Sequence, residues 1–205
     1  MQLYLSRLSL DPLARQVIRD LACPYDMHRT VLRAFPGADA GGPGRVLFRL
    51  ESPPAPDVPP VLLVQSDKPP DWGALDDRGP YALDVQSKAF EVHLPVGRRL
   101  RFRLRANPSV RRDGRRHGLW NDDDQVHWLK RKAELSGFDL HAAVVRAAAS
   151  QVTRRPRNGA PQVHYGVLYE GLLEVRAPGL FAEAVAAGIG PAKAFGFGLL
   201  SLAPA

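Results

Sequence analysis

The sequence predicts an α+β protein made of two successive domains. Its 205 residues allow two domains of about 100 residues each. Apolar residues alternate at a period of two in some segments and recur every three or four positions in others, which indicates both strands and helices. The order of these segments over 1–95 is repeated over 96–205, which favours a duplicated fold over one large domain. At 45% hydrophobic and 24% charged residues, the composition is that of a globular protein able to build a core.

The first half opens with a strand and a broken helix. Residues 2–10 alternate apolar and polar side chains, as a half-buried strand does. Asp11 and the proline after it favour a helix start at that point. Pro24 interrupts this helix, which then continues over 25–35, where Met27 begins an apolar stripe at a spacing of four.

The rest of the first half predicts three strands and one short helical turn. Residues 45–50 and 61–65 read as short strands, separated by a proline-rich loop. Residues 71–77 predict a helical turn, and 81–94 a last strand. The order is therefore strand, helix, strand, strand, weak helix, strand.

The second half repeats this order more clearly. Residues 99–105 alternate apolar side chains with arginine, which predicts a strand with one core face and one cationic face. Asn121 or Asp122 can cap a helix that runs to Ser136 and ends at Gly137. The side chains expected to face inward from this helix are those of Val126, Leu129, Ala133 and Trp128.

Two long strands over 140–153 and 162–175 follow, joined by a basic turn, and a helix over 178–187 precedes a final strand over 195–202. Each half thus reads as βαββαβ, which is the ferredoxin-like arrangement. We expect two tandem ferredoxin-like (RRM-like) domains, an N-terminal one over 1–95 and a C-terminal one over 96–205.

The charge points to a polyanionic partner. The formal net charge is +7, and nucleic acid phosphate is the polyanion that such a surface most often meets. No segment reaches the roughly 18 apolar residues of a membrane span, and the N-terminus lacks the pattern of a signal peptide. We expect a cytoplasmic protein with no membrane partner. Cys23 is the single cysteine, so no internal disulfide forms, and we read it as a small buried hydrophobe.

Tyr25 and His28 form the candidate catalytic pair. They lie three residues apart on one predicted helix, so their side chains point to the same side, and Arg29 flanks them. Histidine has an unperturbed pKa of about 6.5 and can donate or accept a proton at neutral pH. This suits an RNA cleavage in which the ribose 2′-OH attacks the adjacent phosphate. By spacing alone, surface or packing roles for both residues stay open.

Metal chemistry has weak support in this sequence. Asp122 and the two aspartates after it could hold a metal, but three carboxylates before a helix are more simply a charge cluster that favours the helix dipole. We expect no metal site and no cofactor. The other histidines are scattered without ligand spacing and favour solvated or structural roles: His93, His117, His127, His141 and His164.

Near the C-terminus the run GIGPAKAFGFGLLSL combines four glycines with Lys193. Glycine lets backbone N–H groups approach a phosphate, and the lysine adds charge. The run matches neither a Walker loop nor a dinucleotide fingerprint. It could also merely cap a helix and lead into the last strand. Its glycines are Gly188, Gly190, Gly196 and Gly198.

Three basic segments are candidate RNA contacts, although each could be a solvated charge run. They cover 98–105, which ends at Arg105, then 111–116, and 154–157. The last contains Arg154, Arg155 and Arg157 at the tip of the predicted hairpin, a position suited to an RNA groove.

The combination of segments resembles, in order and spacing, the CasE family of type I-E CRISPR systems. It is carried by YLSRLSLDP, RDLACPYDMHRTVLRAFPG, RLRFRLRANP and GIGPAKAFGFGLLSLAP, and it spans essentially the whole chain. Its most specific parts are the YxxHR helix and the C-terminal glycine run, whereas 53–83 adds little.

This resemblance implies that the protein binds the stem-loop of a CRISPR repeat RNA and cuts at its 3′ base without metal, leaving a 2′,3′-cyclic phosphate. It also implies that the protein stays on the hairpin as a Cascade subunit, with other Cascade subunits as partners. On the resemblance, His28 transfers a proton and Tyr25 orients the ribose or phosphate. The expected RNA contacts are Arg29, Arg105, Arg154, Arg155, Arg157, Gly188, Gly190, Lys193, Gly196 and Gly198.

Two other functions remain possible on the sequence. A ferredoxin-like RNA-binding module that never cuts would use Tyr25 and His28 as contacts only. An enzyme for a small phosphorylated metabolite would use the glycine run as an anion cradle. Cleavage assays with concentrated protein would show no product if the first were correct, and a thermal shift with nucleotides but not with hairpin RNA would favour the second.

Overall fold

The computed structural model describes residues 1–205 except 52, 54, 56, 78 and 154–161, and it leaves out the side chains of 147–153 and 162. The described chain forms two compact units. Chain order divides them after Glu91, close to the boundary expected after residue 95, which stays a prediction. The first unit holds Met1–Glu91 and Ala194–Gly196, and the second holds Val92–Val152, 162–193 and Phe197–Ala205.

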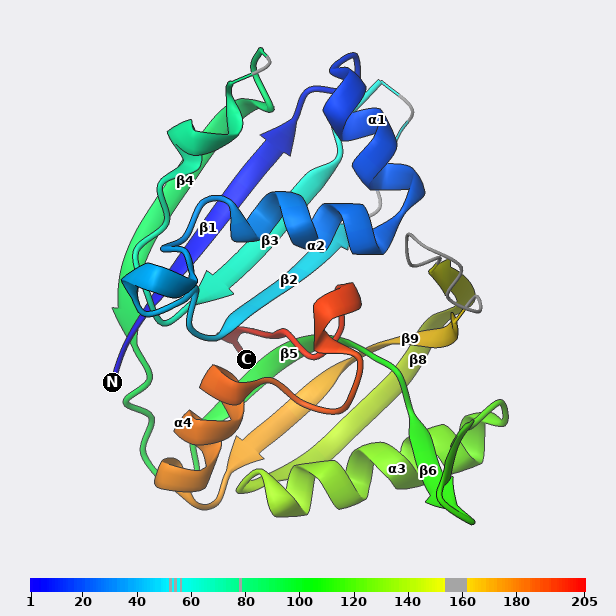
Figure 1. Cartoon of the computed structure of the whole chain (residues 1–205). Coiled ribbons are helices and arrows are strands. Elements are labelled where there is room, and N and C mark those ends of the chain that lie inside the picture. The colour runs from blue at the N-terminus through cyan, green and yellow to red at the C-terminus, as the bar shows by residue number, and fades with distance from the viewer. Residues whose placement is uncertain (52, 54, 56, 78, 154–161) are drawn as a thin grey trace. The chain divides into compact units, whose positions relative to one another are not determined.

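In the first unit, one four-stranded antiparallel sheet carries two helices on one face (Figure 1). The strands lie in the order β2-β3-β1-β4, so the first strand is central and the fourth is at an edge. The elements are β1 (Gln2–Leu10), α1 (Arg15–Ala22), α2 (Pro24–Leu32), the 3-10 turn η1 (Ala38–Ala40), β2 (Val46–Glu51), β3 (Val61–Ser66), the 3-10 turn η2 (Trp72–Leu75) and β4 (Ala82–Glu91).

The core of the first unit lies between this sheet and its helices. Alternation along β1 buries Leu8 and Leu10, and α1 adds Val17. Met27 and Val31, one turn apart on α2, complete the helical side of the core. Burial of these apolar side chains fixes which face of α2 points inward and therefore which side chains remain at the surface.

The two helices of the first unit are shorter than the sequence predicts. The helix expected to start after Asp11 begins at Arg15, because the Asp11 carboxylate accepts a hydrogen bond from the Leu13 backbone N–H at 2.9 Å and closes a local turn. The helix expected to reach Phe35 ends at Leu32. Beyond it the backbone tightens into i→i−3 hydrogen bonds, such as that from the Phe35 N–H to the Leu32 carbonyl.

The second unit repeats this sheet order and adds a small hairpin. Its strands lie in the order β10-β5-β9-β8, and both neighbours of β5 run antiparallel to it. The protein is therefore a mixed α/β structure of antiparallel sheets with few helices. The elements are β5 (Arg99–Ala106), β6 (Ser109–Arg112), β7 (Arg115–Gly118), α3 (Asp122–Leu135), β8 (Phe138–Thr153), β9 (Gln162–Val175), α4 (Pro178–Ala187), the 3-10 turn η3 (Lys193–Phe195) and β10 (Leu200–Pro204).

Helix α3 begins where the sequence predicts. The Asn121 side-chain oxygen caps it by accepting a hydrogen bond from the Asp123 N–H at 2.7 Å, and the three aspartates fill its first turn. The residues that this helix buries differ in part from those predicted. Val126 is only half-buried, whereas Gln125 is fully buried and donates a hydrogen bond to the Leu119 carbonyl at 3.0 Å.

Two further predictions for the second unit are corrected. The last strand was expected over 195–202 but covers Leu200–Pro204. Lys193–Phe195 instead form a 3-10 turn, and the glycines after it take positive φ angles that a strand excludes. The basic segment 111–116 was not assigned to a strand, yet it lies within the antiparallel hairpin of β6 and β7.

Candidate active site and nucleic-acid interface

Helix α2 presents the three predicted residues at the surface of the first unit. Met27 and Val31 are buried in the core, and this orientation leaves Tyr25 and His28 half-buried and Arg29 exposed. The imidazole is therefore not sealed inside the core. An imidazole, a phenol and a guanidinium within four residues of one helix can address one phosphodiester group.

The imidazole of His28 rests on the ring of Phe48. The ring centroids are 6.2 Å apart and the ring planes differ by 20°, so the rings are stacked. Phe48 comes from β2 and is only 2% exposed, which makes it a fixed support. Long-range packing of this kind leaves no periodic signal, so reading the sequence did not reveal Phe48.

Burial also sets the protonation of His28. Its Nδ1 atom is buried and has no hydrogen-bond partner among the described residues. Burial lowers the pKa of His28 below the ordinary 6.5, because the charged imidazolium loses hydration. The ring is therefore neutral at pH 7 in the free protein, and neutral imidazole is the form that accepts a proton.

One predicted glycine belongs to the same unit and contacts the same support. Gly196 has a φ of +83°, and a Cβ atom added there would lie 3.2 Å from Cε2 of Phe48. A side chain at this position would strain the backbone and press on the ring that carries His28. Gly196 thus serves packing around His28, whether or not it also contacts RNA.

A buried polar network joins α1 to α2 next to this helix surface. The Asp20 carboxylate has a fully buried side chain and accepts a hydrogen bond from the Tyr81 hydroxyl at 3.0 Å. Arg19 pairs with the other oxygen of Asp20 at 2.9 Å and also donates to Thr30 of α2 at 3.3 Å. The network holds α2 in place, and neither its carboxylate nor its phenol was singled out from the sequence.

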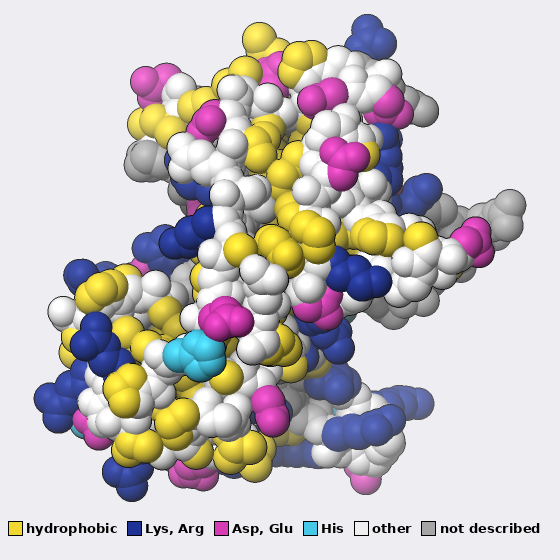
Figure 2. All heavy atoms as spheres, turned by 90° about the vertical axis from the view of Figure 1, so that its left-hand side faces the viewer, with side chains coloured by type: hydrophobic (Ala, Val, Ile, Leu, Met, Phe, Trp, Pro, Cys, Tyr) yellow, Lys and Arg dark blue, Asp and Glu magenta, His cyan; other side chains and the backbone are white. Residues whose placement is uncertain are grey.

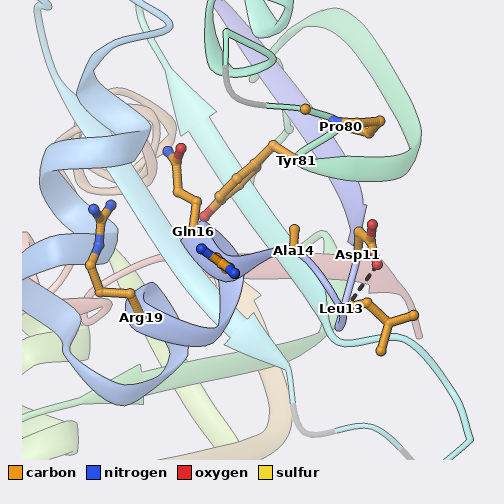
Figure 3. A pocket seen from close by; sticks show the side chains of 9 residues that line it. Asp11, Leu13, Ala14, Gln16, Arg19, Pro80 and Tyr81 are labelled. Atoms are coloured by element: carbon orange, nitrogen blue, oxygen red, sulfur yellow. Dashed lines mark hydrogen bonds between the residues drawn. The ribbon is translucent and has the colours of Figure 1, made fainter.

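A pocket of about 610 Å³ opens beside α1 in the first unit (Figure 3). Arg15 and Arg19, four residues apart on α1, both line it. In Figure 3, Gln16 and Arg19 project from α1, and Tyr81 belongs to the opposite wall. The pocket places two more guanidinium groups on the unit that carries His28.

The glycine run belongs mainly to the second unit, where it closes a loop. The Ile189 N–H donates to the Gly198 carbonyl at 2.9 Å, and the Gly198 N–H donates to the Arg105 carbonyl at 2.8 Å. Gly190 has a φ of +86°, and a Cβ atom there would lie 2.9 Å from the Trp128 ring. Gly198 has a φ of +91°, and a Cβ atom there would lie 3.0 Å from the Ile189 carbonyl oxygen. Packing thus favours glycine at Gly190 and Gly198, as it does at Gly196.

Next to this loop, a second pocket of about 520 Å³ is basic. Arg116, Lys132 and Lys193 line it, together with the backbone of Gly188 and Gly190. Among the described residues that line it, Glu183 is the acidic one. Cations beside glycine backbone are what an anion site requires, so the predicted role of the run in RNA contact keeps its physical basis.

The arginines of β5 divide into two kinds. Arg99 lies opposite Glu174, and Arg103 lies opposite Glu170, with hydrogen bonds of 2.9 Å and 2.6 Å across the strands. These two arginines are neutralised within the sheet. Arg105 differs, because its guanidinium carbon lies 5.2 Å from the centroid of the Phe197 ring.

Lys and Arg side chains are spread over much of the face that Figure 2 shows, among hydrophobic ones. Arg154, Arg155 and Arg157, which were predicted as RNA contacts, lie outside the described residues. Within the described part of the chain, no helix is long and apolar enough to cross a membrane.

Known proteins resemble this chain along its whole length. Residues 3–204 match the family described as CRISPR associated protein. The CRISPR-associated endoribonuclease Cse3 of Thermus thermophilus is 42% identical over 98% of this chain and all of its own length. The Cascade subunit CasE of Escherichia coli K12 is 31% identical, with the same coverage.

A solved structure agrees with these relatives. It is that of Thermus thermophilus Cse3 bound to an RNA representing a pre-cleavage complex, which is 41% identical, covers both chains completely and superposes with a TM-score of 0.90. The match of the family over residues 3–204 and the identity to two relatives along their full length agree, and the chain belongs to the CRISPR-associated protein family that includes Cse3 and CasE.

Proposed function

We propose that this protein binds the stem-loop of a CRISPR repeat and cleaves precursor CRISPR RNA without a metal. The cut is an attack of the ribose 2′-OH on its own phosphate, and it leaves a 2′,3′-cyclic phosphate. The protein then stays on the hairpin as a Cascade subunit. The observation that carries the proposal is the half-buried, neutral imidazole of His28 on α2, in a chain 42% identical to a named endoribonuclease.

The reaction needs one proton removed and one supplied. The 2′-oxygen forms a bond to phosphorus and gives up its proton, while the bond from phosphorus to the 5′-oxygen breaks and that oxygen takes a proton. Because burial lowers the pKa of His28, the free protein holds it in the form that accepts the 2′-OH proton. We therefore assign His28 as the general base, a role that the sequence left open between acid and base.

Tyr25 and Arg29 complete the arrangement on α2. Tyr25 is half-buried and lies one turn before His28, so its hydroxyl hydrogen-bonds the ribose or the phosphate and orients it. Arg29 is exposed and offsets the charge that builds up on the phosphate during attack. Both roles require only side chains that the helix already holds on its surface.

Binding of the stem-loop rests on the basic groups outside α2. The glycine run with Lys193 takes a phosphate, and Arg105 contacts the RNA beside it. Arg154, Arg155 and Arg157 grip the stem. We also propose that each unit is a ferredoxin-like domain, and its strand order, fourth-first-third-second in its own sheet, supports this. The second helix of the first unit is reduced to the turn Trp72–Leu75.

The test compares His28→Ala with His127→Ala, which changes an exposed histidine on α3. Loss of a placed proton acceptor slows single-turnover cleavage of a repeat hairpin by about 10²- to 10⁴-fold. Affinity for the hairpin stays near wild type, and His127→Ala cleaves normally. Full cleavage by His28→Ala would refute the assignment. A wild-type protein that binds the hairpin but never cuts it is instead the non-catalytic RNA-binding module.

The chemistry has a separate test in the substrate. A hairpin with a 2′-deoxyribose at the scissile position lacks the attacking oxygen and should bind without being cut. The same assay in EDTA should leave cleavage of the all-ribose hairpin unchanged. Cleavage of the deoxy substrate would rule out 2′-OH attack, and loss of activity in EDTA would rule out a metal-independent reaction.

A further inference from the structure

The second unit holds an aromatic pocket that none of the predicted site residues occupies. Trp120 is 62% exposed, although tryptophan is a side chain that folding usually covers. Its ring lies 4.3 Å from the ring of Tyr165 between centroids, and the two planes are tilted by 48°. Both rings line a pocket of about 560 Å³, a size within the range of small-ligand sites.

Trp120 is exposed but rigidly mounted. The residue before it, Leu119, donates its backbone N–H to the Pro108 carbonyl at 3.0 Å and accepts a hydrogen bond from the buried Gln125 side chain at 3.0 Å. The residue after it, Asn121, caps α3. The backbone on both sides of this large apolar ring is therefore held in place, which is typical of a binding anchor, because less freedom remains to be lost on binding.

The remaining walls of the pocket carry polar groups. Asn107 and His164 lie on one side, with Nδ2 of Asn107 3.3 Å from Nδ1 of His164. Arg116 of β7, which also lines the pocket, reaches across the hairpin to donate a hydrogen bond from its guanidinium to the Ser109 hydroxyl at 3.0 Å. No aspartate or glutamate lines the pocket among the described residues.

Together these groups match one nucleotide. Flat aromatic rings stack on a base, an amide and an imidazole hydrogen-bond its edges, and a guanidinium takes the phosphate. We propose that Trp120 and Tyr165 hold an unpaired nucleotide of the repeat RNA, next to the stem and not within it. This inference rests on the proposed function and adds a second, single-stranded element to its substrate.

An unpaired base fits this site better than the end of a helix does. A flat platform would suit a terminal base pair, whereas the tilted rings and polar walls form a recess for a single base that has left the stack. Stacking accepts any base, so the rings contribute affinity, and the polar walls contribute what selectivity the site has.

The test uses two RNAs, a bare repeat hairpin and the same hairpin with its single-stranded flanks. Trp120→Ala is compared with wild type, with Trp120→Phe, which keeps a stacking ring, and with Leu83→Ala, which trims an exposed apolar residue of β4. We expect Trp120→Ala to lower the affinity for the flanked RNA roughly 5- to 100-fold and to leave the affinity for the bare hairpin unchanged. Trp120→Phe should retain most of the affinity, and Leu83→Ala all of it.

A base analogue locates the nucleotide. When 2-aminopurine replaces one unpaired base at a time, stacking should quench its fluorescence at a single position, and Trp120→Ala should restore it. Equal binding of the flanked RNA by wild type and Trp120→Ala, with no quenched position, would overturn the inference while hairpin cleavage leaves the proposed function standing. Failure of the wild-type protein to bind either RNA would overturn both.

Discussion

At the scale of single residues, the environment of His28 determines its chemistry. Its neighbour Phe48 offers a ring face and no charge, and Nδ1 is buried without a partner among the described residues. An imidazole in such a place is uncharged at neutral pH, so proton acceptance needs no dedicated carboxylate beside it. This packing opposes protonation of His28, and the resulting loss of folding stability at low pH can be measured.

Acidification should destabilise the wild-type protein through His28. Burial lowers the pKa of His28 in the folded state below 6.5, so the unfolded chain binds more protons in the window between that lowered pKa and 6.5. The contribution of neutral His28 to stability is therefore fully present above pH 6.5 and decreases as the pH falls through that window. His28→Phe keeps a ring against Phe48 but takes up no proton, so its melting temperature should decrease less.

The measurement is a set of thermal melts between about pH 5 and pH 8. His117→Phe, which changes an exposed histidine of β7, serves as the control and should follow the wild-type curve. Parallel curves for His28→Phe and wild type over the whole range would show that His28 does not carry this pH dependence.

Some of this residue-level picture was accessible from the sequence. The spacing of Tyr25, His28 and Arg29 on one helix, together with the family resemblance, predicted the candidate site, and the structure places all three side chains at least partly at the surface of α2. Phe48 could not be predicted, because it lies on β2, well beyond the end of α2 in the sequence, and contacts His28 only through tertiary packing. The sequence shows which side chains can react, whereas the packing partners that adjust their pKa depend on the tertiary fold.

At the scale of elements, the contact between α1 and α2 depends on one buried carboxylate. The Asp20 side chain is inaccessible and ion-paired with Arg19, so its hydrogen bonds from Tyr81 and Arg19 must all be satisfied. Tyr81→Phe removes one of them without opening a cavity. A lost hydrogen bond to a buried charged group costs about 1.5–3 kcal/mol, so we expect the free energy of unfolding to fall by that amount.

Urea denaturation checks this value. Tyr4→Phe removes the same hydroxyl from a half-buried tyrosine of β1 and should change stability by less than about 0.5 kcal/mol. If the free energy of unfolding falls by the same amount in both variants, the hydrogen bond from the Tyr81 hydroxyl to Asp20 does not stabilise the fold.

The sequence predicted elements well where one periodicity dominates. Alternation indicated β1 and β5, and the apolar stripe and capping asparagine indicated α3. It failed where polar residues occupy both faces, as in the β6–β7 hairpin, whose register pairs Arg111 with Arg116. It also failed over 195–198, where apolar residues alternate with glycine but positive φ angles prevent a strand.

At the scale of the whole molecule, the charge of +7 should appear in RNA binding as a dependence on salt. If about six phosphates are neutralised, affinity for a repeat hairpin should fall roughly 10³-fold between 50 and 200 mM salt. The arginines should contribute unequally. Substitution of Arg154, Arg155 and Arg157 by glutamine should make the slope of log affinity against log salt concentration shallower by about 0.9 per lost phosphate contact.

Arg99 and Arg103 provide the matched control. Both are already paired with glutamates of β9, so Arg99→Gln and Arg103→Gln should leave the salt dependence unchanged. Fluorescence anisotropy titrations at several salt concentrations measure the slope. If the slope changes equally in the variants at Arg154, Arg155 and Arg157 and in the variants at Arg99 and Arg103, net charge and not the first three arginines determines the affinity.

The membership of Ala194–Gly196 in the first unit also bears on how the protein is made. Ribosomes deliver the chain from its N-terminus, and nascent domains usually begin to fold as they emerge. Here the segment that touches Phe48 is synthesised long after the helix bearing His28. The first unit therefore reaches its finished form only after residues 194–196 have been made, so a chain that stops before them would carry the histidine without its completed surroundings.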